Sequence, residues 1–279
     1  MNRREEFAAE ARAERPDLAR LCLLLAAELD PDPAGPAAAE RTLDEAEIEL
    51  DRLAGELPYA AGGAGGARGW ASALAELLGG RYGFHGAPAD YQRLDSSLLH
   101  AVLRRRRGLP ILLSVVWMEV ARRAGAPVYG VALPGHFVVG FGDPAERVLA
   151  DPFAGGRPLT GTDAELLVVS ATGAPLDPAY LEPAAPLAIV QRVLGNVRAW
   201  AATRPEHSGV QLAALELALL LPSHPARLRY ERGQLLVQRG EFVLGARELE
   251  SYAEVVTAYD PPAAERIRAE AAAARAMLN

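Results

Sequence analysis

The segment from residue 108 to residue 125 constrains the fold of this chain more than any other. Pro110 suits the first turn of a helix, where its missing amide hydrogen is not needed. Arg122 and Arg123 suit the last turn, and Gly125 suits the position just beyond it. The first half of this helix is apolar nearly all round, so other elements must cover every side of it. The sequence therefore predicts a globular protein built around one buried helix.

Three segments after this helix have the pattern of short β-strands. They are 128–133, 136–141 and 147–151, and turn residues separate each from the next. The middle segment alternates in the manner of a strand with one face in a core. Because short turns join antiparallel neighbours, the segments predict an antiparallel meander. The fold class that follows is α+β.

A turn centred between Asp143 and Pro144 would pair the last two segments. In that register Phe137 faces Ala150, Val139 faces Val148 and His136 faces Asp151. Directly opposite side chains have Cβ atoms about 4.5–5.5 Å apart, so the carboxylate can hold one imidazole nitrogen and leave the other pointing outward. This is the geometry of an oriented general base. A slip of one residue would place the two side chains on opposite faces of the sheet.

The histidine has a structural interpretation as well as a chemical one. An aspartate at the end of a sheet often satisfies a histidine, and such a pair does no covalent chemistry without a nucleophile. Ser114, one turn inside the buried helix, is a weak candidate for that nucleophile. Its hydroxyl is more simply explained by a hydrogen bond to a carbonyl one turn back. Both interpretations of His136 and Asp151 stay open on the sequence.

The region before the buried helix is predicted to be helical. Asp17 suits an N-cap, and Thr42 and Glu45 have capping-box spacing. A glycine-rich run over 62–66 predicts a surface loop, and it lacks the Lys-Ser/Thr ending of a phosphate loop. The expected helices are 17–29, 42–58, 71–78 and 96–103.

Composition excludes several classes of function. A net charge of -7, from 29 basic and 36 acidic residues, leaves no dense positive face for general nucleic-acid binding. The chain has no lysine, which excludes Schiff-base chemistry. Acidic residues early in the chain and the absence of a long apolar run predict a cytoplasmic protein without a signal peptide or membrane span.

Cys22 and the arginine run over 104–107 each have a simple explanation. Cys22 is the only cysteine and lies in an apolar run, so we expect a buried, unreactive thiol and no multi-cysteine metal site. One His and one Asp are too few ligands for a metal, and no cofactor is expected. The arginines either form a patch for an anionic partner or pair in part with carboxylates of the core.

Several motifs around the buried helix share an order and a spacing with a known family. They are Gly108-Leu109-Pro110-Ile111-Leu112-Leu113-Ser114, Ala124-Gly125-Ala126-Pro127-Val128-Tyr129-Gly130-Val131, Leu133-Pro134-Gly135-His136-Phe137 and Asp151-Pro152-Phe153 with Gly155-Gly156. With these motifs the chain resembles the SirB family of transglutaminase-like proteins over nearly its whole length.

The resemblance implies a papain-like, transglutaminase-type core. In such a core a cysteine at the start of the central helix works with a histidine and an aspartate on the following strands, and His136 and Asp151 match the latter two. The cysteine position falls on or next to Pro110, where no cysteine stands. This departure removes the thiolate and with it the acyl-enzyme route of the superfamily.

The C-terminal part resembles a tetratricopeptide repeat. Its small and aromatic positions are Gly233, Gly240, Phe242, Gly245-Ala246 and Leu249. Because about three repeats are needed for independent stability, one clear unit must pack on other elements. The repeat is either an interaction surface or a helical brace.

These observations predict two domains and favour one function. A SirB-type domain is expected over 1–180, helical over 1–107 with the core helix and sheet over 108–172, and a helical repeat region over 187–279. The favoured function is that of a non-enzymatic regulatory protein that binds a protein or peptide partner on a pseudoenzyme core. The alternative is a hydrolase- or transferase-type enzyme in which His136, oriented by Asp151, acts as general base. The sequence sets neither the partner nor the oligomeric state.

Overall fold

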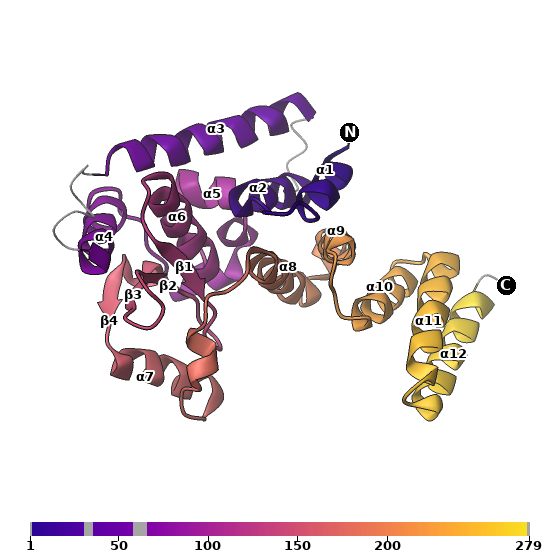
Figure 1. Ribbon diagram of the computed structural model, residues 1–279. Coiled ribbons are helices and arrows are strands. Elements are labelled where there is room, and N and C mark those ends of the chain that lie inside the picture. Colours follow the sequence, from indigo (N-terminus) through magenta and orange to yellow (C-terminus); the bar gives the residue numbers. More distant parts are fainter. Residues whose placement is uncertain (1, 31–35, 58–65, 278–279) are drawn as a thin grey trace. The chain divides into compact units, whose positions relative to one another are not determined.

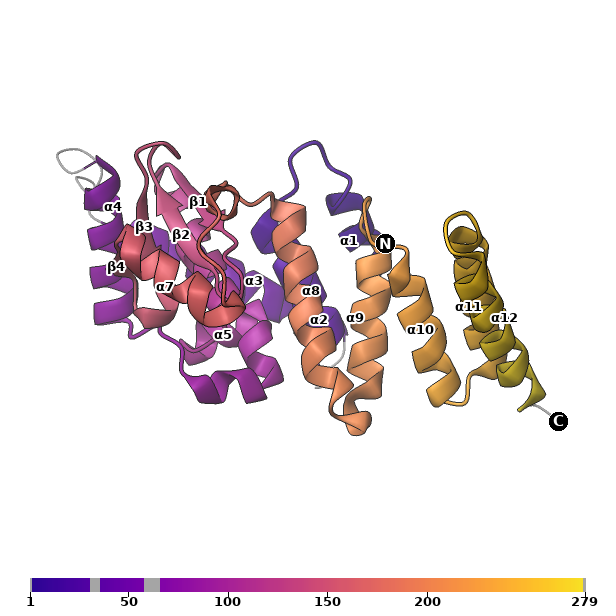
Figure 2. The same ribbon diagram turned by 90° about the horizontal axis from the view of Figure 1, so that it is seen from below.

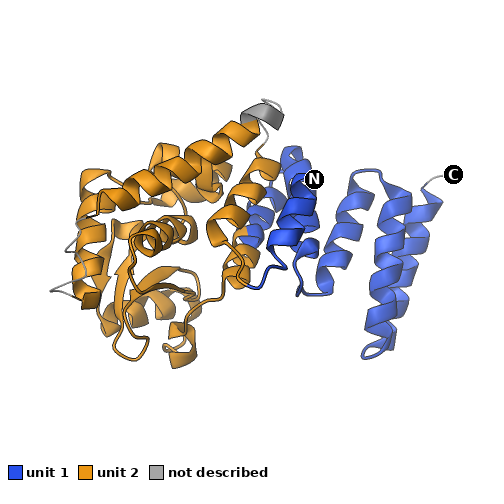
Figure 3. Ribbon diagram, turned by 45° about the horizontal axis from the view of Figure 1, so that its top comes forward, with its two compact units in different colours: residues 1–14, 194–279 blue, residues 15–193 orange. Residues whose placement is uncertain are grey.

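A computed structural model describes residues 2–30, 36–57 and 66–277 of the chain. The predicted glycine-rich loop over 62–66 lies outside these residues except for Gly66. Contacts divide the chain into two compact units (Figure 3). Residues 15–193 are called the first unit in the text and are orange, with the label unit 2, in the figure. Residues 1–14 with 194–279 are called the second unit in the text and are blue, with the label unit 1, in the figure. This division differs from the predicted boundary between 180 and 187.

The first unit, residues 15–193, contains most of the predicted N-terminal helices. Asp17 caps the first of them by accepting a hydrogen bond from the backbone N–H of Arg20, as predicted. The second begins at Pro36 rather than at Thr42, because proline suits a first helical turn and the alanines after it continue the helix. The helices of this unit, apart from the start of α8, are α2 (Leu18–Leu29), α3 (Pro36–Gly55), α4 (Gly66–Leu74), α5 (Leu99–Arg105), α6 (Pro110–Arg123) and α7 (Gly161–Thr172) (Figure 1).

Helix α6 is the buried helix that the sequence predicts. Every residue from Pro110 to Ala121 is buried, and Trp117 is fully enclosed. Gly125 takes a left-handed conformation with φ 85° directly after the helix, where a residue with a Cβ atom would be strained. The predicted position of this helix is confirmed.

A four-stranded antiparallel sheet packs on α6. Its strands follow chain order and are β1 (Val128–Val131), β2 (Val138–Phe141), β3 (Val148–Asp151) and β4 (Arg157–Leu159) (Figure 2). Helix α6 contacts β1 and β2, while Ala164 and Val168 of α7 pack on the other face against Val131, Val138 and Leu149. The transglutaminase-type α+β core is therefore present. The sequence did not predict β4, because three residues that include a proline carry no alternating pattern.

The register of β2 and β3 differs from the predicted one by two residues. Val139 pairs with Ala150 and Phe141 with Val148. The turn is centred between Pro144 and Ala145, because Asp143 accepts hydrogen bonds from the backbone N–H groups of Ala145 and Glu146. A shift of two keeps each side chain on its predicted face, since side chains alternate with a period of two.

Both edges of the sheet have a feature that limits further pairing. Along β1, Val131 forms a bridge with Pro183, and the N–H of Ala184 donates to the carbonyl of Gly130 at 2.9 Å. The other edge strand, β4, carries Pro158, which has no amide hydrogen.

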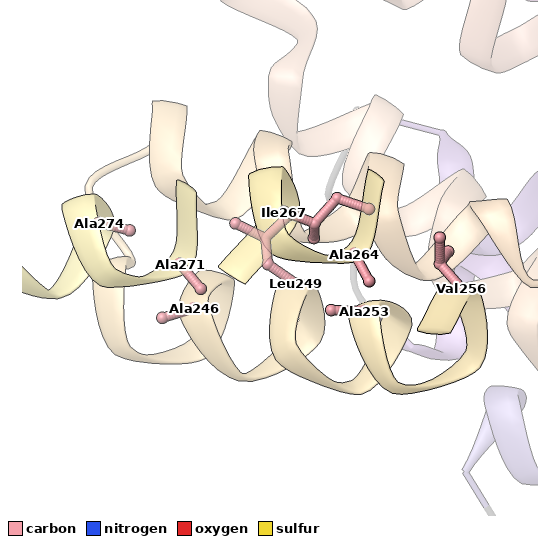
Figure 4. Close-up of a cluster of buried hydrophobic side chains, with 8 residues drawn as sticks. All are labelled: Ala246, Leu249, Ala253, Val256, Ala264, Ile267, Ala271 and Ala274. Atoms are coloured by element: carbon pink, nitrogen blue, oxygen red, sulfur yellow. The ribbon is translucent and has the colours of Figure 1, made fainter. Parts of the chain in front are cut away.

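The second unit is entirely helical in its described residues. It contains α1 (Arg3–Glu10), the end of α8 (Pro186–Ala202), α9 (Ser208–Leu220), α10 (Arg227–Gln238), α11 (Phe242–Thr257) and α12 (Pro261–Ala276). Helices α10 and α11 meet at Gly233 and Gly245, where a Cβ on Gly245 would lie 2.8 Å from the carbonyl oxygen of Gly233. Alanines with a few larger side chains fill the contact between α11 and α12 (Figure 4). The predicted helical tail is confirmed.

Candidate functional site

The imidazole of His136 and the carboxylate of Asp151 lie in direct contact within the first unit. His136 Nε2 is 3.0 Å from Asp151 Oδ1, and the two side chains are 11% and 8% exposed. The predicted neighbours meet, but not as a cross-strand pair. His136 lies in the loop between β1 and β2, two residues before the start of β2, and Asp151 is the last residue of β3. The side chain of His136 crosses from that loop to the end of the neighbouring strand.

The turn after β3 fixes the position of Asp151. Its Oδ1 also accepts a hydrogen bond at 2.9 Å from the backbone N–H of Phe153. The Phe153 ring stands edge-on to the imidazole, with ring centroids 5.9 Å apart. On its other side this ring lies against Gly86, where a Cβ would be 1.9 Å from the nearest ring carbon. Only glycine at position 86 leaves room for the ring.

A second glycine lies against the same turn. Residues 75–81 continue α4 as a π-helical segment, and a Cβ on Gly79 would lie 1.9 Å from the carbonyl oxygen of Gly155. Such segments are uncommon and occur often beside functional sites. The backbone of this segment therefore supports the turn that carries Asp151 and Phe153.

Arg192 of α8 holds the loop that carries His136. Its Nη2 donates to the carbonyl of Leu133 at 2.8 Å and to the carbonyl of His136 at 2.6 Å. Its guanidinium also lies 5.5 Å from the centroid of the Phe137 ring. Arg192 is not among the residues that the sequence predicts for the site. The sequence does contain one signal for it: Arg192 is a charged residue among apolar neighbours of α8 that are buried, such as Ile189 and Val193.

Tyr91 completes the surroundings of the pair. It lies in a short 3-10 helix, Pro88–Gln92, with its ring edge-on to Phe153 at a centroid distance of 6.1 Å. Burial raises the pKa of Tyr91, the charge of Asp151 raises it further, and the charge of Arg192 opposes both. The phenol is therefore a neutral donor near neutral pH, within electrostatic range of both charged groups.

Neither Ser114 nor Cys22 hydrogen bonds to the His136 ring among the described residues, and Pro110, at or next to the predicted cysteine position, has no nucleophilic side chain. Pro110 is the buried first residue of α6, and Ser114 donates its hydroxyl to the carbonyl of Phe137 at 3.3 Å. Ser114 was expected to bond to a carbonyl one turn back, but it bonds instead to this carbonyl in the loop directly before β2. Cys22 is fully buried in α2, and burial raises the pKa of its thiol. Within the part of the chain that the structure describes, the imidazole hydrogen bonds to Asp151 alone.

A second His–Asp contact occurs elsewhere in the same unit. His100 Nε2 lies 3.0 Å from Asp30 Oδ2, and the histidine side chain is 5% exposed. Its Nδ1 is buried without a hydrogen-bond partner. Burial is the largest influence and lowers the pKa of His100. The residue lines a cleft of about 270 Å³ between α3 and α5.

The arginine run is divided among several contacts. Arg105 and Arg107 pair with the buried carboxylate of Asp90, at 3.4 and 3.2 Å. The guanidinium of Arg106 lies over the Tyr82 ring, 5.0 Å from its centroid. For Arg105 and Arg107 the contacts agree with pairing to a core carboxylate rather than with a patch for an anionic partner.

Within residues 2–30, 36–57 and 66–277, no three His, Cys, Asp or Glu side chains gather as metal ligands. None of the helices there has both the length and the apolar character needed to cross a bilayer.

Comparison with known proteins adds two family matches. A model described as Transglutaminase-like superfamily matches residues 44–195, and one described as Tetratricopeptide repeat matches residues 197–279. The first contains α6, the sheet, His136 and Asp151, and the boundary between the two models falls within α8. The second contains the predicted repeat.

Individual relatives include bacterial and animal proteins. A UPF0162 protein of Xylella fastidiosa is 34% identical over 192 residues, which are 66% of this chain and 67% of that protein. A UPF0162 protein of Pseudomonas aeruginosa is 35% identical over 63% of this chain and 57% of its own length. Mouse F-box only protein 21 is 28% identical over 63% of this chain and 28% of its own. The menin crystal structure aligns with 97% of this chain and 69% of its own at 15% identity, with a TM-score of 0.43.

Proposed function

Because this chain belongs to the transglutaminase-like superfamily and continues into a tetratricopeptide repeat, we propose that it is a non-enzymatic protein that binds a protein or peptide partner. The partner would be held at the surface around His136 and Asp151, on a core that has lost the nucleophilic cysteine. Within the superfamily we propose membership of the SirB family, on the motifs quoted above, and a location in the cytoplasm.

One observation carries this proposal. Asp151 occupies one nitrogen of the imidazole, and no described thiol or hydroxyl hydrogen bonds to the other. On the family resemblance, Pro110, the first residue of α6, falls at or next to the position of the superfamily's cysteine. A histidine and an aspartate held without a nucleophile still present fixed polar groups, and we propose that these recognise a partner.

The repeat supports a binding role. Tetratricopeptide units stack helices into extended surfaces, a common platform for protein partners. The close approach of α10 and α11 at Gly233 and Gly245 gives such a surface a rigid base. We therefore propose two partner surfaces, one in each unit.

Partner capture from a cell lysate tests the first surface. The baits are the purified wild type, His136→Ala and His224→Ala, which removes a histidine of the other unit. Matching melting temperatures are required before the capture results are compared. Captured proteins are identified, purified and re-tested by direct titration, so that non-specific capture is recognised.

The proposal expects a partner that binds the wild type and His224→Ala and is weakened at least tenfold by His136→Ala. If every verified partner binds all three proteins equally, the surface around His136 is not the binding site. A loss seen only with His224→Ala would move binding to the helical unit.

A second candidate function is an enzyme in which His136 acts as general base. It is favoured by the accessibility of the second imidazole nitrogen: Nδ1 has no bond among the described residues and is not one of the fully buried unpaired atoms. Asp151 would orient the ring, and the base would activate a water molecule rather than a protein thiol. Turnover of an amide or ester panel that disappears in His136→Ala would establish this function and overturn the non-enzymatic one.

A further inference from the structure

Arg192 uses only one of its three side-chain nitrogens in hydrogen bonds to the described residues. Nη2 makes both hydrogen bonds, to the carbonyls of Leu133 and His136. Nε and Nη1 bond to no described residue, and neither is a fully buried atom, so both remain open to solvent. A guanidinium has five N–H donors in a planar fork, so three donors are available on this residue.

No described carboxylate pairs with Arg192. Other arginines of the same unit do have one: Arg107 pairs with Asp90, and Arg123 with Glu47 and Asp51. The guanidinium is partly buried, and this burial lowers the pKa of Arg192. Keeping a partly buried cation uncompensated is costly, and binding an anion from outside would remove that cost.

The surroundings of Arg192 suit an anionic group on a peptide. Tyr91 is a neutral phenol within electrostatic range of the guanidinium, and it is 47% exposed. Phe153 places an apolar ring between Tyr91 and His136. Asp151 is within electrostatic range of Tyr91, and its negative charge disfavours a dianion such as phosphate more than a single carboxylate.

We propose that the free donors of Arg192, with Tyr91 within electrostatic range of them, bind a carboxylate of the partner and so place that part of the partner next to the His136–Asp151 pair. A planar carboxylate matches the fork of a guanidinium. The inference rests on the proposed function, because it names the chemical group that the surface around His136 recognises. A peptide C-terminus and an acidic side chain share this chemistry.

Three synthetic peptides separate these sources. They are acetyl-Ala-Ala-Phe with a free carboxylate, the same peptide as its C-terminal amide, and acetyl-Ala-Asp-Phe amide. Binding to the full chain is followed by the carbon-bound imidazole signals in a ¹H–¹³C NMR spectrum, which has only five histidines to resolve. A shift of the His136 signal indicates binding at the proposed site, and the signals of the other four histidines serve as internal controls.

The expected result is a His136 shift that saturates with at least one carboxylate peptide and at least tenfold weaker binding of the neutral amide. The carboxylate peptide that binds more tightly shows whether the site prefers a peptide C-terminus or an acidic side chain. Arg192→Gln should weaken that peptide at least tenfold and leave the amide unchanged. Arg147→Gln removes another arginine of this unit, one that donates to the carbonyl of Leu181, and should have no effect.

Equal binding of acid and amide by the wild type would overturn the inference, as would the absence of any His136 shift at millimolar peptide. Both results come from the wild type alone, so they stand even if Arg192→Gln disturbs the loop it holds. They are also distinct from failure of the proposed function. That function fails when verified partners ignore His136→Ala, whatever the short peptides do.

Discussion

Two His–Asp pairs in the first unit have the same contact and different surroundings. In both, Nε2 of the imidazole lies 3.0 Å from a carboxylate oxygen. In the pair of His100 and Asp30 the aspartate is the exposed partner, at 33%, and the second imidazole nitrogen is buried without a partner. In the pair of His136 and Asp151 the aspartate is the more buried side chain, and the second nitrogen is open.

The difference identifies which pair is suited to recognise another molecule. A carboxylate held by a backbone N–H, next to a histidine whose free nitrogen reaches solvent, presents a fixed polar surface. A histidine whose second nitrogen is buried, as in His100, cannot offer that nitrogen to a ligand. Contact distance alone does not distinguish the two pairs.

The largest effect on stability is expected from a substitution in the segment 75–81, which supports the pair of His136 and Asp151 but not the pair of His100 and Asp30. Gly79→Ala would place a Cβ 1.9 Å from the carbonyl oxygen of Gly155, in the turn after Asp151. We expect a loss of about 3–4 kcal/mol in the free energy of unfolding, measured by urea denaturation, and a shifted NMR signal of His136. The His100 signal should stay in place in the folded variant.

Gly80→Ala is the matched control in the same π-helical segment. The nearest atom to a Cβ at this position is the carbonyl oxygen of Ala75 at 3.8 Å, an ordinary contact. A change below about 0.5 kcal/mol is expected. Equal losses in both variants would show that the segment tolerates no side chain at all and that the contact with Gly155 has no special role.

A smaller difference in stability is expected between alanine variants of the two aspartates, Asp151 and Asp30. Asp151→Ala removes a buried acceptor of two hydrogen bonds and should cost about 2–3 kcal/mol, because the N–H of Phe153 loses its partner. Asp30→Ala removes a more exposed carboxylate and should cost about 1 kcal/mol. Both losses in the free energy of unfolding can be measured by urea denaturation near pH 7. The reverse order would contradict the distinction between the pairs.

The smallest effect is a pH dependence that belongs to His100. Since its pKa is lower in the folded state, the unfolded state takes up the proton first as the pH falls. Stability is therefore complete above the ordinary histidine pKa of about 6.5 and decreases below it, by at most about 1.4 kcal/mol per pH unit. His100→Gln should lose less stability than the wild type between pH 7 and pH 5. Parallel pH profiles would show that His100 does not cause the decrease.

The sequence predicted the parts of the fold that depend on local patterns. The buried helix α6 and the faces of β2 and β3 follow from apolar periodicity, and Asp17 follows from capping chemistry. The register did not follow, because the hydrogen bonds of Asp143 moved the turn by one position. The strand β4 was missed because it has only three residues.

The same limit applies to the site. His136 and Asp151 could be brought together from sequence because they lie only 15 residues apart and the hairpin of β2 and β3 connects them, although His136 lies in the loop before β2. Arg192 could not, because it reaches the loop of His136 from 56 residues away and only the tertiary fold brings it there. Gly79 and Gly86 read as loop or helix-end residues in the sequence, and their role depends on what packs against them.

The closed edges of the sheet bear on how this protein can associate. One edge is occupied by residues 183–184 and the other carries Pro158, so neither offers a long row of free backbone groups. Both features disfavour a partner that binds by adding a strand, and they disfavour two copies that join their sheets into a continuous ribbon. We therefore expect association through this core to use side chains and its specificity to change with single substitutions at the surface.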